Sequence, residues 1–340
     1  MKTIKLGFIG CGKISEKHFA ALENLKDRIT VQAVCDLNQD RATAAAQKVG
    51  AKAYTDMQEM LTSEDLDIVT IATPNGLHAD HICQVADHGI SVVTDKPIAI
   101  TLEEGQRAVN HCREKEVQLF VSHQLRYNDK IQVIKNAIDQ GRFGQIYMIT
   151  ANVFWNRNDD YYNQVPWHGT RAMDGGAYVT QASHFVDLMQ WFAGGKPRSV
   201  YANLKTLARS IETEDTGIST FEWDNGIVGN LNVTMLSYNK NFESSMTILG
   251  EKGTMKIGGP GMNDILHWEF SEEKPEDTDI RNNHCPSYSA IPAGHGRLYE
   301  DVADALDGNE ALLTGIEGLK SLELLQAIND SSAQKTVVNF

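Results

Sequence analysis

Apolar positions in the first third of the chain form two alternating patterns. Short, nearly continuous apolar runs predict buried strands, and the amphipathic stretches between them predict helices. The predicted strands are Ile4–Ile9, Thr30–Cys35, Ile68–Ala72, Ser91–Thr94 and Gln118–Ser122. The predicted helices are Glu16–Leu25, Asp40–Val49, Ala79–Asp87 and Glu103–Lys115. This alternation indicates βαβ units and a parallel sheet.

After Gly144 the pattern changes to long segments in which apolar and polar residues alternate. Turn signals such as Asp224-Asn225-Gly226 separate these segments, so an antiparallel sheet is expected. The predicted strands are Gln145–Phe154, Ser199–Leu207, Gly217–Trp223, Gly226–Met235 and Phe242–Leu249. Helices are predicted at about Gly175–Phe192, His295–Leu306 and Ile316–Ser332, and a surface loop at Ser271–Pro292.

Length and charge narrow the class of protein. A chain of 340 residues exceeds the usual size of one hydrophobic core, and the change of pattern predicts domains at residues 1–124 and 125–340. The formal net charge of −14 works against non-specific binding to nucleic acids or anionic membranes. No apolar run is long enough to predict a transmembrane helix.

Cysteine and histidine spacing bears on metal binding and on the redox environment. The five cysteines are scattered and include no CxxC pair, which is typical of free thiols in a reducing cytoplasm. The eleven histidines include no HxxxH or HxH pair. The sequence therefore predicts a cytoplasmic protein without a metal site.

Gly10 and Gly12 begin a Gly-x-Gly-x-x-Ser motif that follows a predicted strand and opens a predicted helix. Gly10 permits a tight turn, Gly12 lets the backbone approach a pyrophosphate, and Ser15 fills the last small position. Asp36 ends the second predicted strand, where a carboxylate accepts hydrogen bonds from ribose hydroxyls and repels a 2′-phosphate. These features predict a dinucleotide-binding domain that prefers NAD to NADP.

Two further segments follow predicted strands, at the sheet edge where parallel sheets bind ligands. In Asp95-Lys96-Pro97, the lysine can hold a substrate hydroxyl and lower its pKa, or it can relay a proton. Taken alone, this segment also fits a surface lysine before a turn. Thr73-Pro74-Asn75 with His78 is either a turn with a helix cap or a set of contacts to a nicotinamide ribose.

The glycine motif, Asp36, Ala72-Thr73-Pro74-Asn75 with His78, and Asp95-Lys96-Pro97 together resemble the glucose-fructose oxidoreductase / inositol dehydrogenase family. The resemblance covers essentially the whole chain, although members usually carry Glu-Lys-Pro, so Asp95 is a conservative departure. The segment from Asp174 is similar to the family pattern G-G-G-x-x-x-D-x-G-x-H-x-x-D, whose Asp and His lie in the active site. His184 and Asp187 match this pattern, whereas its first Asp falls on Thr180.

The resemblance implies an α/β fold with NAD as the cofactor. An N-terminal Rossmann domain would be followed by a C-terminal α+β domain with a large open, mostly antiparallel sheet. Such sheets usually pack face to face, so a homo-oligomer, a dimer or tetramer, is expected. The residues predicted to bind NAD are Gly10, Gly12, Lys13, Ile14, Asp36, Thr73, Pro74, Asn75, His78, Asp95, Lys96 and Gln124.

Scattered motifs are similar to one branch of this family. They are Asn152–Arg157, Tyr161-Tyr162, Trp167–Gly169, Gln181–His184, Glu214–Gly217, Asn232–Met235, Thr247–Glu251 and His267–Phe270. That branch oxidises C3 of UDP-N-acetyl-glucosaminuronic acid with NAD, and an aminotransferase then uses the 3-keto sugar in lipopolysaccharide or O-antigen synthesis. Its members commonly carry Asn where this chain has Thr180.

The resemblance also implies roles at the substrate. His184 is predicted to be the general base that takes the hydroxyl proton, and Lys96 the cation that stabilises the developing alkoxide. The other predicted substrate contacts are Arg126, Arg157, Tyr161, Thr180 and Gln181. The two arginines are included because a planar guanidinium suits a carboxylate or a phosphate. The neighbouring aromatic residues fit either stacking on a nucleobase or packing in the core.

Several alternatives stay open at this point. Close relatives act on UDP-N-acetylglucosamine, and other enzymes of this fold act on a free polyol or inositol. Some relatives are non-catalytic dinucleotide-binding regulators, although the presence of both Lys96 and His184 favours an enzyme. NAD is either released after each turnover or re-oxidised in place by a co-substrate such as a 2-oxo acid.

Overall fold

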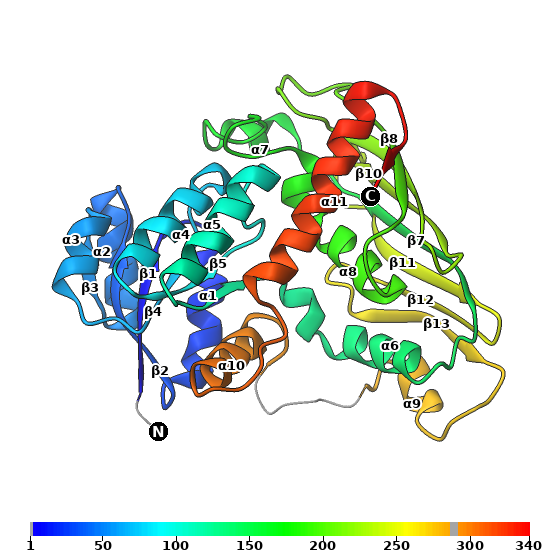
Figure 1. Ribbon diagram of the computed structural model, residues 1–340, viewed down its shortest axis with the longest axis horizontal. Coiled ribbons are helices and arrows are strands. Elements are labelled where there is room, and N and C mark those ends of the chain that lie inside the picture. The colour runs from blue at the N-terminus through cyan, green and yellow to red at the C-terminus, as the bar shows by residue number, and fades with distance from the viewer. Residues whose placement is uncertain (1–2, 286–291) are drawn as a thin grey trace. The chain divides into compact units, whose positions relative to one another are not determined.

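The computed structural model describes residues 3–285 and 292–340, which form two compact units (Figure 1). Unit 1 comprises Met1–Tyr127 and Ser289–Leu322, and unit 2 comprises Asn128–Tyr288 and Glu323–Phe340. The predicted division at residue 124 differs, because it places all later residues in one domain. The chain returns to unit 1 because Leu298, Tyr299 and Val302 are buried in the core of that unit.

Unit 1 is built on a parallel sheet of six strands in the order β3-β2-β1-β4-β5-β6. The strands are β1 (Ile4–Ile9), β2 (Ile29–Cys35), β3 (Lys52–Tyr54), β4 (Ile68–Ile71), β5 (Ser91–Thr94) and β6 (Leu119–Val121). This order reverses direction between β1 and β4, and parallel sheets bind dinucleotides at the carboxyl ends of the strands beside such a switch. The short strand β3, which has no buried residue, is absent from the sequence prediction.

Helices cover both faces of this sheet. They are α1 (Ser15–Leu22), α2 (Gln39–Val49), α3 (Met57–Ser63), α4 (His78–Asp87), α5 (Leu102–Glu114) and α10 (His295–Leu306). One apolar cluster includes residues of α1, α2 and α10, and a second includes residues of α3, α4 and α5. The helix starts follow local signals: Thr101 and Glu104 form a capping box at α5, and Asn38 caps α2.

Unit 2 contains an eight-stranded sheet in the order β13-β12-β11-β7-β10-β9-β8-β14. The strands are β7 (Ile146–Phe154), β8 (Ser199–Lys205), β9 (Thr216–Glu222), β10 (Val228–Thr234), β11 (Glu243–Gly250), β12 (Gly253–Gly258), β13 (Asp264–Phe270) and β14 (Val338–Asn339). Only β7 and β10 pair in parallel among these neighbours, so the predicted, mostly antiparallel sheet is confirmed. The last three strands in the chain were not predicted.

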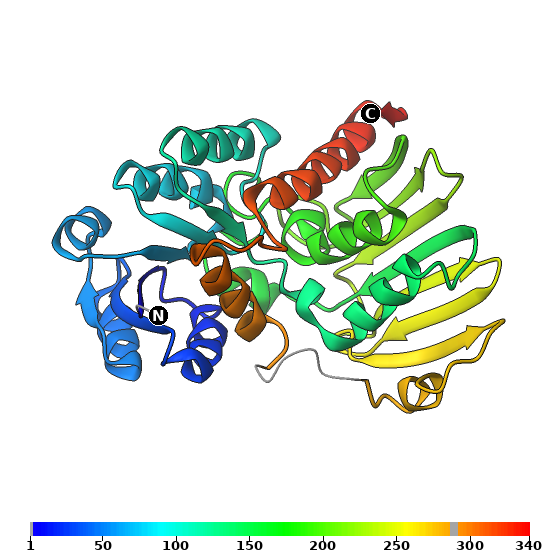
Figure 2. The same cartoon turned by 60° about the horizontal axis from the view of Figure 1, so that its bottom comes forward.

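The helices of unit 2 lie on one face of this sheet or at its ends (Figure 2). They are α6 (Asp129–Asp139), α7 (Asp159–Asn163), the π-helix η4 (Ala177–Gln181), α8 (Ser183–Ala193), α9 (Asp277–Arg281) and the end of α11 (Gly315–Gln334). The helix predicted from Gly175 thus begins as a π-helix, and α9 lies within a segment predicted to be a loop. Among the described helices, none combines the length and apolarity that a membrane span requires.

Candidate active site

The glycine turn of unit 1 has the shape that a bound pyrophosphate requires. Gly10 has φ +96°, and a Cβ there would lie 2.6 Å from the carbonyl oxygen of Ala72, so only glycine fits. A Cβ at Gly12 would meet nothing within 4 Å, which leaves open space beside the turn. Helix α1 then begins at Ser15, and its first amides point out of the helix end, where they can bind anions.

Asp36 follows β2 and is held beside this turn. Its carboxylate accepts hydrogen bonds from the backbone N–H groups of Cys11 and Asn38, both at 2.9 Å. The Asp36 side chain is 11% exposed, and the Nε atom of Arg41 lies 3.5 Å from it. A fixed carboxylate at this strand end accepts hydrogen bonds from a ribose diol and repels a 2′-phosphate, so the residues present fit NAD.

His78 ties together the two loops that follow β4 and β5. Its Nε2 atom lies 2.9 Å from the carbonyl oxygen of Thr73, and its Nδ1 atom 2.6 Å from that of Pro97. The ring is buried, and this burial lowers the pKa of His78. Because backbone oxygens face both ring nitrogens, we interpret His78 as a residue that shapes these loops.

Lys96 stands between Asp95 and a cis-proline, directly after β5. The carboxylate of Asp95 accepts a hydrogen bond from the hydroxyl of Ser122 at 2.9 Å. Burial alone would raise the pKa of Asp95, but the neighbouring His18 and Lys96 outweigh this effect, and the pKa lies below its usual value. An ionised Asp95 therefore stands next to the ammonium group that is predicted to bind the substrate hydroxyl.

The remaining residues predicted to contact NAD also lie in unit 1. Lys13 is exposed and Ile14 half-buried at the start of α1, and Asn75 is buried at the start of a short 3-10 helix. The Thr73 hydroxyl lies 3.1 Å from Nδ1 of His81. Gln124 begins another 3-10 helix, and its buried Oε1 atom makes no hydrogen bond to any described residue. Their cofactor contacts stay predictions.

His184 is the second residue of α8 in unit 2, and the π-helix before it carries Thr180 and Gln181. The N–H of Ala182 donates to the carbonyl oxygen of Ala177, five residues earlier, at 2.9 Å. This wide turn follows Gly176, which has φ +105°. His184 is half-buried, and Asp187, one turn later, is buried.

A carboxylate is present beside Thr180, although the sequence pattern indicated that one was missing. The Thr180 hydroxyl lies 2.5 Å from Oδ1 of Asp174 and 2.6 Å from its carbonyl oxygen. The other carboxylate oxygen of Asp174 accepts the N–H of Gly169 at 2.7 Å. Asp174 occupies the first glycine position of the family pattern, and this exchange of residue type is the signal that could have identified it.

Glu214 is a second carboxyl group in this part of unit 2, half-buried, and sequence reasoning gave it no role. Its Oε1 atom accepts the N–H of Tyr178 at 2.8 Å, and a Cβ at position 176 would lie 2.4 Å from its Oε2 atom. Burial raises the pKa of Glu214 to about 7, and the nearby Asp174 adds to this effect. The start of the π-helix thus rests on a carboxyl group that titrates near neutral pH.

Arg157, Tyr161 and Gln181 form one cluster in unit 2. Nη2 of Arg157 donates to Oε1 of Gln181 at 3.0 Å, and Nε2 of Gln181 donates to the Tyr161 hydroxyl at 3.0 Å. The guanidinium lies over the rings of Trp155 and Tyr161, 4.9 and 5.1 Å from their centroids. Its Nε atom is buried and makes no hydrogen bond to any described residue.

Arg126, in contrast, lies in unit 1, and its buried side chain forms an ion pair with a half-buried carboxylate. Its Nη1 atom lies 2.8 Å from the carboxylate of Glu317, and the arginine side chain is only 4% exposed. Among the predicted substrate residues, Arg157, Tyr161, Thr180 and Gln181 therefore belong to unit 2, and Arg126 does not. The ion pair gives Arg126 a structural role, and we leave it out of the proposed sugar site.

Comparison with known families gives two matches, and the boundary between them lies close to the start of unit 2 at Asn128. Residues 4–123 match the oxidoreductase family with an NAD-binding Rossmann fold, and residues 131–256 match the GFO/IDH/MocA C-terminal domain. An inositol 2-dehydrogenase from Salmonella typhimurium is 26% identical over 262 residues, which cover 75% of this chain and 74% of that protein.

Two solved structures are similar over the full chain. The WlbA dehydrogenase from Bordetella pertussis, in complex with NADH and UDP-GlcNAcA, has a TM-score of 0.94 and 43% identity, and covers 100% of this chain and 98% of its own. The WlbA dehydrogenase from Chromobacterium violaceum, with the same two ligands, has a TM-score of 0.94 and 41% identity, with 100% and 96% covered. The chain is therefore a member of the GFO/IDH/MocA family and an NAD-dependent oxidoreductase.

Proposed function

We propose that this enzyme oxidises the C3 hydroxyl of UDP-N-acetyl-glucosaminuronic acid to the 3-keto sugar, with NAD as the oxidant. The observation that carries the proposal is the similarity over the whole chain, at 43% identity, to a dehydrogenase whose structure contains NADH and UDP-GlcNAcA. An aminotransferase would consume the product in the synthesis of a lipopolysaccharide sugar.

Arg157 supports a substrate that carries a carboxylate. The Nε atom of its guanidinium is buried and has no hydrogen-bond partner among the described residues, whereas its Nη atoms donate to Asn156, Asn241 and Gln181. A substrate carboxylate beside this atom would accept a charge-assisted hydrogen bond from it. The aromatic rings of Trp155 and Tyr161 hold the guanidinium in place. A neutral sugar would offer this donor only an uncharged acceptor, whose hydrogen bond is weaker.

His184 and Lys96 divide the chemistry at the reacting hydroxyl. His184 accepts the hydroxyl proton, because an imidazole titrates near neutral pH. Lys96 donates a hydrogen bond to the same oxygen and stabilises its negative charge. NAD, when bound, supplies the hydride acceptor. Asp174 and Glu214 fix the π-helix that leads into His184, so the base starts from a defined backbone position.

The open face of the unit 2 sheet supports a homo-oligomer. Apolar side chains on this face are exposed in five strands: Met148, Tyr201, Ile218, Val228 and Leu249. Val228 pairs with Met148 and Met148 with Leu249, so three of these residues lie in one row across the sheet. An apolar row on an otherwise uncovered sheet face favours packing against a second copy of the chain.

The assay that tests the proposal compares three substrates with NAD: UDP-N-acetyl-glucosaminuronic acid, UDP-N-acetylglucosamine and myo-inositol. NADH absorbance reports turnover, and mass spectrometry identifies the keto product. A parallel reaction contains a 2-oxo acid, in case the cofactor stays bound and is re-oxidised in place. We expect turnover with the uronate alone, abolished by His184→Ala. Turnover with a neutral substrate would contradict the proposed substrate, and no turnover at all would favour a regulatory protein.

A further inference from the structure

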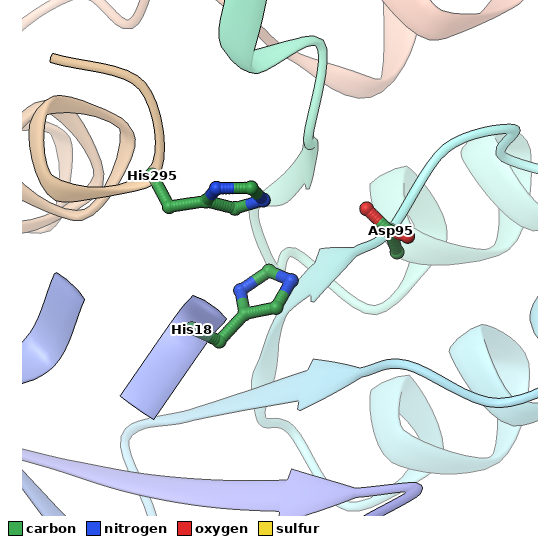
Figure 3. Close-up of side chains that lie close together, drawn as sticks. All are labelled: His18, Asp95 and His295. Atoms are coloured by element: carbon green, nitrogen blue, oxygen red, sulfur yellow. The ribbon is translucent and has the colours of Figure 1, made fainter. Parts of the chain in front are cut away.

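Three side chains of metal-binding type meet inside unit 1 (Figure 3). His18 belongs to α1, Asp95 follows β5, and His295 begins α10. One ligand atom of each lies within 4.8 Å of the others. They come from three distant parts of the sequence, which explains why motif spacing predicted no metal site.

Both imidazoles present a nitrogen atom that the described residues leave unsatisfied. The Nε2 atoms of His18 and His295 are buried and make no hydrogen bond to any described residue. His18 is fully buried and His295 is 9% exposed, and their rings meet edge to face with centroids 4.5 Å apart. Buried ring nitrogens normally have a partner, so these two atoms indicate a ligand that binds imidazole nitrogen.

Further hydrogen bonds orient the ligand set. Nδ1 of His18 lies 2.8 Å from the Tyr299 hydroxyl, which lies 3.0 Å from the Thr70 hydroxyl. A proton on Nδ1 of His18 would leave the lone pair on Nε2. Asp95 accepts the Ser122 hydroxyl through Oδ1, which leaves its other carboxylate oxygen available for a cation. Metal ligands are commonly held by outer hydrogen bonds of this kind.

We propose that His18, Asp95 and His295 bind one divalent transition-metal ion of the zinc class. Two imidazole nitrogens and one carboxylate oxygen suit Zn²⁺, and they leave a fourth position for water. The carboxylate offsets part of the charge of the ion. The bound ion would join α1, the end of β5 and α10, three elements that the chain supplies from far apart.

The test uses full-length protein treated with a chelator and then dialysed. Co²⁺ serves as the spectroscopic probe, followed by displacement with Zn²⁺ and by elemental analysis. We expect one ion per chain, with visible absorption bands of a four-coordinate nitrogen and oxygen site. Asp95→Asn and His295→Gln should each weaken Co²⁺ binding at least about ten-fold. The matched control is His267→Gln, at an exposed position of β13, which should bind Co²⁺ like the wild type.

Two further measurements separate the loss of metal binding from a loss of folding and identify the ligands of the ion. Thermal unfolding of each metal-free variant shows whether the substitution itself disturbs the unit. X-ray absorption of the zinc-loaded wild type should show two imidazoles and no sulfur ligand, which excludes binding at the free cysteines. The proposal is overturned if the wild type retains less than one ion, if both variants bind as the wild type does, or if sulfur coordinates the ion.

Discussion

The hydroxyl of Thr180 donates a hydrogen bond to the carboxylate of Asp174, 2.5 Å away. The family pattern places its aspartate at the position that Thr180 occupies here. The residue at the first glycine position of that pattern, Asp174, thus places a carboxylate in contact with position 180. Asp174 also accepts the N–H of Gly169, so its orientation is fixed.

The contact between Thr180 and Asp174 predicts how kcat changes when the two positions are substituted singly and together. Asp174→Gly should lower kcat about 100-fold, because the π-helix before His184 loses its anchor. The double variant Asp174→Gly/Thr180→Asp restores the arrangement of the family and should recover at least about ten-fold of that loss. Steady-state kinetics with the uronate check both values. A double variant no better than Asp174→Gly would contradict this prediction.

Arg157 should set the preference for a charged sugar. Arg157→Met should raise KM for the uronate about 10- to 100-fold, since a hydrogen bond to a charged group contributes roughly 1.5–3 kcal/mol. Any residual turnover of UDP-N-acetylglucosamine should change little, because that sugar has no carboxylate. The control is Arg198→Met, whose guanidinium pairs with Glu222 at the surface. An equal loss with both sugars would assign Arg157 a purely structural role.

Glu214 should make the stability of the protein depend on pH. Its pKa in the folded protein is raised to about 7, above the unfolded value, so protonated Glu214 stabilises the fold below about pH 4.5, and this contribution is lost as the pH rises through 7. The loss amounts to roughly 3 kcal/mol at most. The Tm, measured between about pH 5 and about pH 8, should therefore decline more steeply with rising pH for the wild type than for Glu214→Gln.

The control for this experiment is Glu269→Gln, because Glu269 is exposed on β13. That variant should keep the pH dependence of the wild type. If Glu214→Gln also keeps it, then Glu214 is not the group that titrates.

Asp36 should determine the choice between NAD and NADP. Asp36→Ser should lower kcat/KM with NAD about ten-fold and raise it with NADP, because the repulsion of a 2′-phosphate is removed. Arg41 already lies 3.5 Å from Asp36 and would then be available to the phosphate. Asp40→Ser, an exposed position in the first turn of α2, is the matched control. Unchanged discrimination would assign the preference to other residues.

Charge on the open sheet face should dissociate the oligomer. Ile218 is 56% exposed and Val228 42% exposed, and the double variant Ile218→Lys/Val228→Lys places two cations on that face. Light scattering after size-exclusion chromatography should show a smaller species than the wild type. Ile316→Lys, at an exposed position of α11, is the control and should leave the mass unchanged. A wild-type mass in the double variant would place the interface elsewhere.

The sequence predicted the strands of unit 1 well because each is a short apolar run between turn signals. Strand β5 was predicted at its observed bounds, and β4 ends one residue before its predicted end. Short elements without a buried face, such as β3, give no such pattern. The return of α10 to unit 1 also was not predicted, because an amphipathic helix does not specify which core it joins.

The candidate site was predictable where its chemistry is local in sequence. The glycine turn with Asp36 could be interpreted because strand order brings successive strand ends together. The partnership of Glu214 with Gly176 could not, since it depends on how distant segments pack. The same holds for the buried Arg126, whose half-buried partner Glu317 lies far along the chain.

The π-helix at Ala177–Gln181 holds one residue more than a regular α-helical turn would. Each residue of an α-helix turns the chain by about 100°, so this extra residue sets the rotation of Thr180 and Gln181 relative to His184. A change of one residue in the length of this turn would alter that rotation by about 100° and leave every functional side chain in the sequence. The length of this turn therefore sets the directions in which these side chains point, independently of which residues they are.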